Sequence, residues 1–155
     1  MKPVVSDLPR HRRPLLESVP PVGREHVPGG REPPRRYRGL TITEEWCGPA
    51  LVVAVGGEVD LGSAPVLRHV LDAARRRAPR RIVVDLSFVR FLDTAGLAVL
   101  IDAHRRAGPG IDVRLVATTR ATWRPLRLTR VYERLDVHSS RAAAIAARRP
   151  GDGSR

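Results

Sequence analysis

The chain has 155 residues, enough for one domain of ordinary size with tails, and 42% of them are hydrophobic, as in a globular protein. No apolar run approaches the roughly 20 residues of a membrane-spanning helix, and no apolar stretch follows the first charges, so we expect a cytoplasmic protein without a membrane segment. The single cysteine, Cys47, excludes an internal disulfide and cannot form a thiolate metal site by itself, and we expect neither a metal nor a cofactor.

The formal net charge of +12 is concentrated in the tails: residues 1–39 carry +5 and residues 141–155 carry +3. Of the 28 basic residues only Lys2 is lysine, a bias that a GC-rich coding sequence produces whatever the function. Single-strand binders interleave aromatic with basic residues for stacking, and the sequence lacks that pattern. We therefore expect a solvated basic surface, with nucleic-acid binding disfavoured.

Residues 1–39 contain eight of the fourteen prolines and no sustained period of 2 or 3.6. Such a segment cannot bury enough apolar surface to offset the entropy of ordering. We expect a disordered extension over residues 1–39, one domain over residues 40–148 and a disordered tail over residues 149–155.

The predicted domain opens with two strands. Residues 40–43 alternate like a half-buried strand, Cys47-Gly48-Pro49 forms a turn, and residues 51–55 form a continuous apolar run that Gly56-Gly57 ends. A helix follows, with Ser63 as its N-cap and Pro65 in its first turn. Its apolar residues recur at helical spacing as far as Ala74, and Pro79 lies beyond its end.

Ile82-Val83-Val84 is short and β-branched, which indicates a strand buried on both faces. A second helix begins near Asp93 or Thr94 and ends at Gly108-Pro109-Gly110. Residues 113–116 form a further strand, and residues 121–130 and 139–148 look helical. Strands that alternate with helices predict an α/β fold, here a mixed sheet of four to five strands packed by helices.

Two segments resemble the signature of STAS domains that antagonise anti-sigma factors: Gly57–Pro65 with Leu67, and Val84–Leu97. The resemblance spans roughly residues 40–148 and implies a single STAS domain. In that family, the residue directly after the aspartate at a helix start is phosphorylated by an anti-sigma factor that is also an ATP-dependent kinase. That residue is Thr94 in this sequence.

The resemblance further implies partner switching. The unmodified antagonist binds the kinase and frees the sigma factor, the phosphorylated form does not, and a PP2C-type phosphatase restores the first state. A hydroxyl in the first turn of a helix lies near unpaired backbone N–H groups, where a phosphate is electrostatically tolerated. The added charge would nonetheless repel an acidic partner surface.

Seven further residues in the two segments are expected at the partner-facing surface: Glu58, Asp60, Ser63, Asp93, Ala95, Gly96 and Leu97. Three of them have alternative roles. Asp60 could be a solvated loop acid, Asp93 could cap the helix, orient Thr94 or do both, and Gly96 could serve either partner approach or helix-to-strand packing.

Two departures from the motif leave alternatives open. Thr94 replaces the commoner serine, and Ala95 replaces a second hydroxyl, so Thr94 is the sole acceptor in the motif. The alternatives are a STAS scaffold that is not phosphorylated, or a basic module whose arginine-rich tails bind polyanions. The sequence holds no phosphate-binding loop, nucleophile elbow or spaced catalytic set, so we expect a binding protein and not an enzyme.

Overall fold

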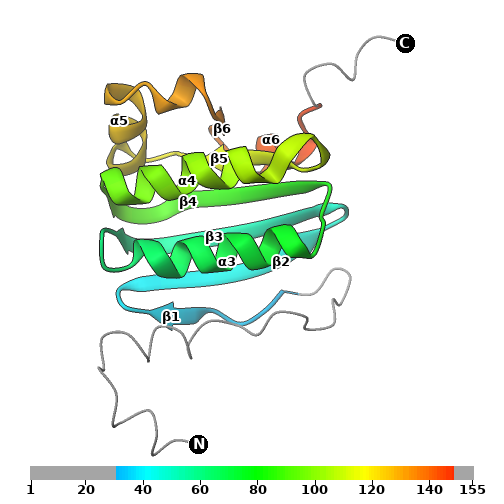
Figure 1. The fold of residues 1–155 in the computed structure, drawn as a ribbon, viewed down its shortest axis with the longest axis horizontal. Coiled ribbons are helices and arrows are strands. Elements are labelled where there is room, and N and C mark those ends of the chain that lie inside the picture. The colour runs from blue at the N-terminus through cyan, green and yellow to red at the C-terminus, as the bar shows by residue number, and fades with distance from the viewer. Residues whose placement is uncertain (1–30, 149–155) are drawn as a thin grey trace, which may run out of the picture.

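The computed structural model describes residues 31–148, which form a six-stranded mixed sheet with helices on both faces (Figure 1). The strands lie in chain order across the sheet: β1 (Arg35–Tyr37), β2 (Leu40–Cys47), β3 (Ala50–Val59), β4 (Arg81–Leu92), β5 (Asp112–Val116) and β6 (Asp136–His138). Pairing is antiparallel from β1 to β3 and parallel from β3 to β6. The expected α/β class is confirmed, with more strands than the four to five predicted.

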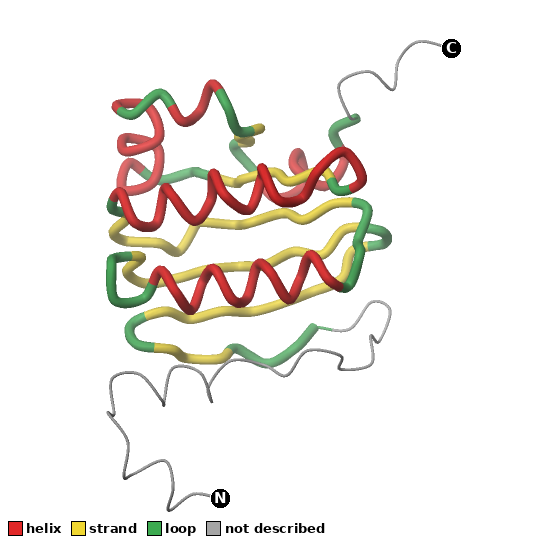
Figure 2. The backbone as a smooth tube through the Cα atoms, in the orientation of Figure 1, coloured by secondary structure: helices red, strands yellow, loops and turns green. Residues whose placement is uncertain are grey.

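Four α-helices connect and cover the strands: α3 (Ala64–Arg76), α4 (Thr94–Ala107), α5 (Arg120–Leu128) and α6 (Arg141–Ala146). Short 3-10 turns, η1 (Gly108–Gly110) and η2 (Val131–Glu133), follow α4 and α5. Figure 2 shows α3 and α4 side by side on one face of the sheet, and α6 lies behind it. No helix in residues 31–148 is long and apolar enough to cross a membrane.

The core is aliphatic, as the scarcity of aromatic residues requires. The larger apolar cluster lies between the sheet and the α3–α4 layer, and a smaller one joins Val52, Val83 and Val116 to Ala144 of α6. Ile82, Val83 and Val84 are all buried, which confirms a strand covered on both faces.

The first strand lies inside the segment expected to be disordered. Arg35–Tyr37 forms a hairpin with β2 through a two-residue turn, Arg38-Gly39, whose φ angles of 42° and 82° are those of a tight hairpin. Tyr37 is buried and holds the strand to the core. Predicting residues 1–39 as disordered was therefore wrong for this strand, and residues 1–30 and the tail at 149–155 lie outside the described residues.

The second strand predicted from the apolar run also continues further than expected. Gly56-Gly57 does not end β3; the register with β4 shifts on either side of these glycines, and the strand runs on to Val59. Gly57 has φ +94°, and a Cβ on it would lie 1.9 Å from the carbonyl oxygen of Gly39. Glycine at this position thus allows a bulge through which β3 continues to Val59.

Candidate partner-binding site

The two signature segments meet at one end of the sheet, where β3 and β4 both terminate. Val59 and Leu92 are paired as the last residues of these parallel strands, and the backbone N–H of Asp93 donates to the carbonyl oxygen of Val59 at 3.1 Å. Residues 60–63 then lead into α3, while Asp93 leads directly into α4. Parallel pairing therefore brings the two segments to the same end of the sheet.

Asp93 is the N-cap of α4. Its backbone is extended, and its Oδ1 accepts a hydrogen bond from the N–H of Gly96 at 3.1 Å, as the capping interpretation requires. Thr94 is the first residue of the helix and is exposed. Within the described chain its hydroxyl makes no hydrogen bond, so it faces solvent at the positive end of a 14-residue helix.

Gly96 fits the helix against the ends of the strands. It is buried, and a Cβ on it would lie 2.6 Å from both Leu92 Cδ1 and Val59 Cγ1. The geometry supports the packing interpretation. Leu97 is also buried in the core, and Ala95 is half-buried against it. Of the residues expected after Asp93, only Thr94 and part of Ala95 are therefore open to a protein surface.

The loop before α3 is held by its own side chains. Asp60 Oδ1 accepts from the N–H groups of Gly62 and Ser63, each at 3.0 Å. The buried hydroxyl of Ser63 donates to the carbonyl oxygen of Glu58 at 2.8 Å and accepts from the N–H of Asp60 at 3.0 Å.

Ser63 is the N-cap residue of α3, as predicted, but its side chain makes no capping hydrogen bond because the hydroxyl is used within the loop. Asp60 is half-buried and shapes the loop, while Glu58 is exposed. Glu58 lies in β3, next to the last residue of the strand, and is the more exposed of these two acids.

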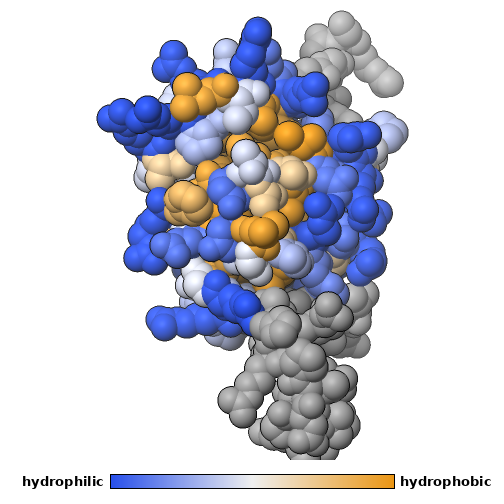
Figure 3. Space-filling view, turned by 60° about the vertical axis from the view of Figure 1, so that its left-hand side comes forward, coloured by the Kyte–Doolittle hydropathy of each residue, from blue (hydrophilic) through white to orange (hydrophobic). Residues whose placement is uncertain are grey.

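Three large apolar side chains are exposed at this end of the molecule. Leu61 at the loop tip is 79% exposed, Phe91 near the end of β4 is 50% exposed, and Leu128 at the end of α5 is 72% exposed. Figure 3 turns this end towards the viewer and shows apolar residues gathered at its centre, with hydrophilic residues around them. Apolar residues grouped in this way indicate a protein-binding surface. Sequence reasoning missed all three, because hydrophobicity alone predicts burial.

Two grooves flank Thr94 and Ala95. The first, of about 680 Å³, lies between α4 and α5; Phe91, Leu97, Pro125 and Leu128 line it, with Thr94 at the α4 side. The second, of about 430 Å³, lies between α3 and α4 and is lined in part by Leu61, Ala95 and Ala98.

The groove between α4 and α5 is basic. Arg90, Arg120 and Arg124 line it, and Asp93 is the single acidic residue among the described residues that do so. Two of these arginines come from α5, which is distant in sequence from both signature segments. The charge beside Thr94 is therefore set by folding, and no motif in the sequence indicates it.

A protein-family model described as "Mlab, STAS domain" matches residues 42–136, within the domain predicted at 40–148. The chain belongs to the STAS domain family. Among curated relatives, the anti-sigma-F factor antagonist RsfB of Mycobacterium tuberculosis is 29% identical over 112 residues, covering 72% of this chain and 92% of the relative. The antagonist RsfA of the same organism is 31% identical over 101 residues, covering 63% and 79%.

Solved structures support the same assignment. This STAS domain resembles the crystal structure of an anti-sigma factor antagonist from Mycobacterium paratuberculosis with a TM-score of 0.68 and 31% identity, covering 70% of this chain and 92% of the other. The family resemblance inferred from the two signature segments is thereby confirmed. By name, these relatives are anti-sigma factor antagonists.

Proposed function

We propose that this STAS domain is a cytoplasmic anti-sigma factor antagonist whose partner is an anti-sigma factor with an ATPase-type kinase domain. Binding of the antagonist would release the sigma factor, and phosphorylation of Thr94 would end the interaction. The observation that carries the proposal is the exposed hydroxyl of Thr94 at the start of α4, inside an apolar surface. The names of the relatives support the role of antagonist.

The switching step is a phosphoryl transfer from ATP held by the partner. Oγ1 of Thr94 bonds to the γ-phosphorus, the bond from that phosphorus to the β–γ bridging oxygen breaks, ADP leaves, and the hydroxyl proton passes to a base. Asp93 keeps the helix start in place by capping it, which fixes where Thr94 is presented. A PP2C-type phosphatase would return the hydroxyl by hydrolysis.

Phosphate on Thr94 would place negative charge at the edge of the basic groove between α4 and α5. A partner that fills this groove would place apolar groups against Leu128 and Phe91 and carboxylates near Arg120 and Arg124. The phosphothreonine would add about −1.5 to −2 charges at the groove's edge. It would both repel the partner's carboxylates and compete for the same guanidinium groups.

The remaining expected residues divide by accessibility. Glu58, Asp60 and the half-buried Ala95 can contact the partner directly. Ser63, Gly96 and Leu97 are buried, so we assign them to positioning the loop and the start of α4.

The test combines the purified chain with its cognate anti-sigma factor, identified by pull-down from the native cell. With ATP, mass spectrometry should find one phosphate on the intact chain and none on Thr94→Val, which keeps the shape but removes the hydroxyl. By calorimetry, Thr94→Glu should weaken binding at least tenfold, or about 1.4 kcal/mol. Ala142→Glu is the matched control, because it adds the same charge on exposed α6.

Each outcome bears on a separate part of the proposal. A partner that binds but never modifies Thr94 would remove the switch and leave the alternative of a non-phosphorylated scaffold. Equal affinities for the chain and Thr94→Glu would contradict the electrostatic mechanism. Absence of any anti-sigma factor among captured proteins would contradict the antagonist role itself.

A further inference from the structure

The face of the sheet opposite α3 and α4 is only partly covered. In the described residues, α6 packs over the region around Val52 and Val83, and a concave surface of about 640 Å³ remains open beside it over β2, β3 and β4. Small side chains form its floor, with Ala54 and Gly56 on β3 and the hydroxyls of Thr41 and Thr43 on β2.

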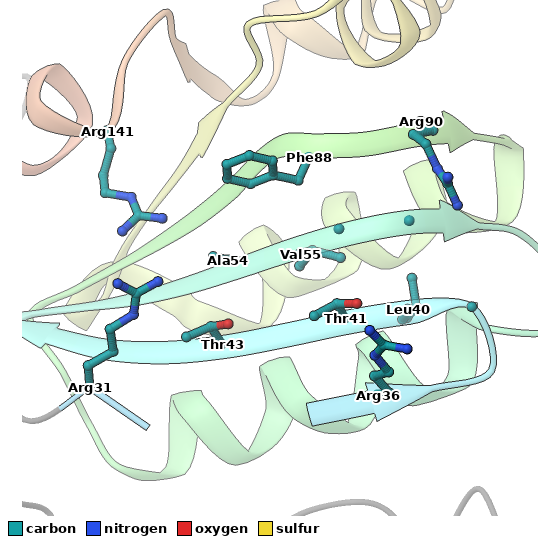
Figure 4. Close-up of a pocket in the computed structure, with 13 residues that line it drawn as sticks. Arg31, Arg36, Leu40, Thr41, Thr43, Ala54, Val55, Phe88, Arg90 and Arg141 are labelled. Atoms are coloured by element: carbon teal, nitrogen blue, oxygen red, sulfur yellow. The ribbon is translucent and has the colours of Figure 1, made fainter. Parts of the chain in front are cut away.

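Four arginines surround this open face. Figure 4 shows Arg31 and Arg141 towards one end and Arg36 and Arg90 towards the other, with their guanidinium groups over the sheet. They come from four different segments, and among the described lining residues there is no acid.

Pairing leaves the open face positively charged. Arg141 is held by Asp85 at 2.9 Å and by Glu45 at 3.3 Å. Within residues 31–148, the other three arginines have no carboxylate at ion-pair distance. Two positive charges therefore remain on this face after both acids are counted against the four arginines.

One aromatic ring lies between the two ends. Phe88 on β4 is 70% exposed and stands over the open face, between the arginine pairs (Figure 4). On β2, Arg31 lies opposite Glu45 and Arg36 lies opposite Thr41. Because these two β2 residues are four positions apart, Arg31 and Arg36 are separated by about 13 Å along the strand. A solvent-exposed aromatic ring flanked by guanidinium groups can stack on a base while the arginines bind phosphates.

We propose that this sheet face binds single-stranded nucleic acid, with a base stacked on Phe88 and the backbone phosphates at Arg31, Arg36 and Arg90. An added peptide strand would need unpaired backbone N–H and C=O groups, which the interior strands β2, β3 and β4 do not offer. A second copy of the chain would place arginine against arginine. Single-stranded nucleic acid supplies both phosphates that pair with the arginines and flat bases that stack on Phe88.

The experiment measures anisotropy of a fluorescein-labelled oligouridylate of about twelve nucleotides, titrated with the full chain. Phe88→Ala should weaken binding at least about fivefold through lost stacking. Arg31→Ala combined with Arg36→Ala should weaken it about tenfold and reduce its salt dependence. Both changes are at exposed side chains, so circular dichroism should show an unchanged fold.

Matched controls separate this face from the basic charge of the whole chain. Arg76→Ala with Arg105→Ala removes the same charge from the exposed helix layer, and Phe91→Ala removes the aromatic ring beside Thr94. Neither control should change oligouridylate affinity more than about twofold.

Three results would overturn the proposal. The first is that the oligouridylate does not bind saturably, and the second is that both arginine double variants lose the same affinity for it. The third is that poly-L-glutamate displaces the oligouridylate and Phe88→Ala has no effect on affinity. The last result would identify a surface for acidic peptides. The substituted residues Phe88, Arg31 and Arg36 lie outside the α4–α5 groove, so binding of the anti-sigma factor should persist in these variants whatever the outcome.

Discussion

Replacing Gly96 by alanine tests how the start of α4 is fixed to the sheet. The added methyl group would lie 2.6 Å from Leu92 Cδ1 and from Val59 Cγ1, about 0.8 Å short of the 3.4 Å at which ordinary contact begins. Both neighbours are buried, and the branched side chain of Val59 has little freedom to turn away. The helix must therefore move off the strand ends, or the core must shift.

The magnitude follows from two opposing effects. Overpacking a buried site costs about 1–3 kcal/mol, whereas alanine in place of glycine inside a helix returns about 1 kcal/mol. We expect Gly96→Ala to lower the free energy of unfolding by up to about 2 kcal/mol, measured by urea denaturation with circular dichroism. The displacement of Thr94 should also slow its phosphorylation, because transfer depends on its position.

Two companion variants make the test specific. Gly110→Ala is the matched control, because nothing lies within 4 Å of a Cβ there, and its stability should equal or slightly exceed that of the unaltered chain. Val59→Ala should relieve the overlap, so the double variant should lose at least about 0.5 kcal/mol less than the sum of the single losses. Stability of Gly96→Ala at or above the unaltered level, with additive losses in the double variant, would refute the reasoning.

Two other predictions concern a buried acid and an exposed apolar residue. Burial raises the pKa of Glu44 above its ordinary 4.5, despite Arg77 at 3.4 Å, so the folded state binds a proton more tightly than the unfolded state. The free energy of unfolding should therefore fall as pH rises through that raised pKa. Glu44→Gln should flatten this pH dependence in urea titrations at several pH values, and an unchanged slope would contradict the prediction. Leu128→Ala should weaken binding of the anti-sigma factor severalfold, as measured by calorimetry, because the Leu128 side chain is 72% exposed in the α4–α5 groove. The same exposure means that the free energy of unfolding should change by less than about 0.5 kcal/mol. Unaltered affinity would show that the partner binds elsewhere.

Local patterns were sufficient for the central elements. Apolar spacing predicted α3, a β-branched run predicted the buried first part of β4, and glycine with proline predicted the end of α4. The signature segments located Asp93 and Thr94 at a helix start, because a cap and its first turn are specified by adjacent residues. These features depend on contacts close in sequence.

The short edge strands could not be predicted in this way. β1 and β6 have three residues each, and neither has enough alternation to differ from a loop. They are strands because a neighbouring strand supplies hydrogen bonds, and in β1 because Tyr37 reaches the core. Gly56-Gly57 looked like a strand end, and only the approach of the Gly39 carbonyl explains why glycine is needed within β3.

Sequence by itself therefore determined the STAS fold, the position of Thr94 and the acids around it. Tertiary structure alone decided what surrounds them: Arg120, Arg124 and Leu128 line one groove with Thr94 because α5 packs against β4. It likewise brought arginines from four separate segments to the open sheet face around Phe88. A motif records neighbours along the chain, whereas a binding surface depends on neighbours in space, which packing of the sheet and helices brings together.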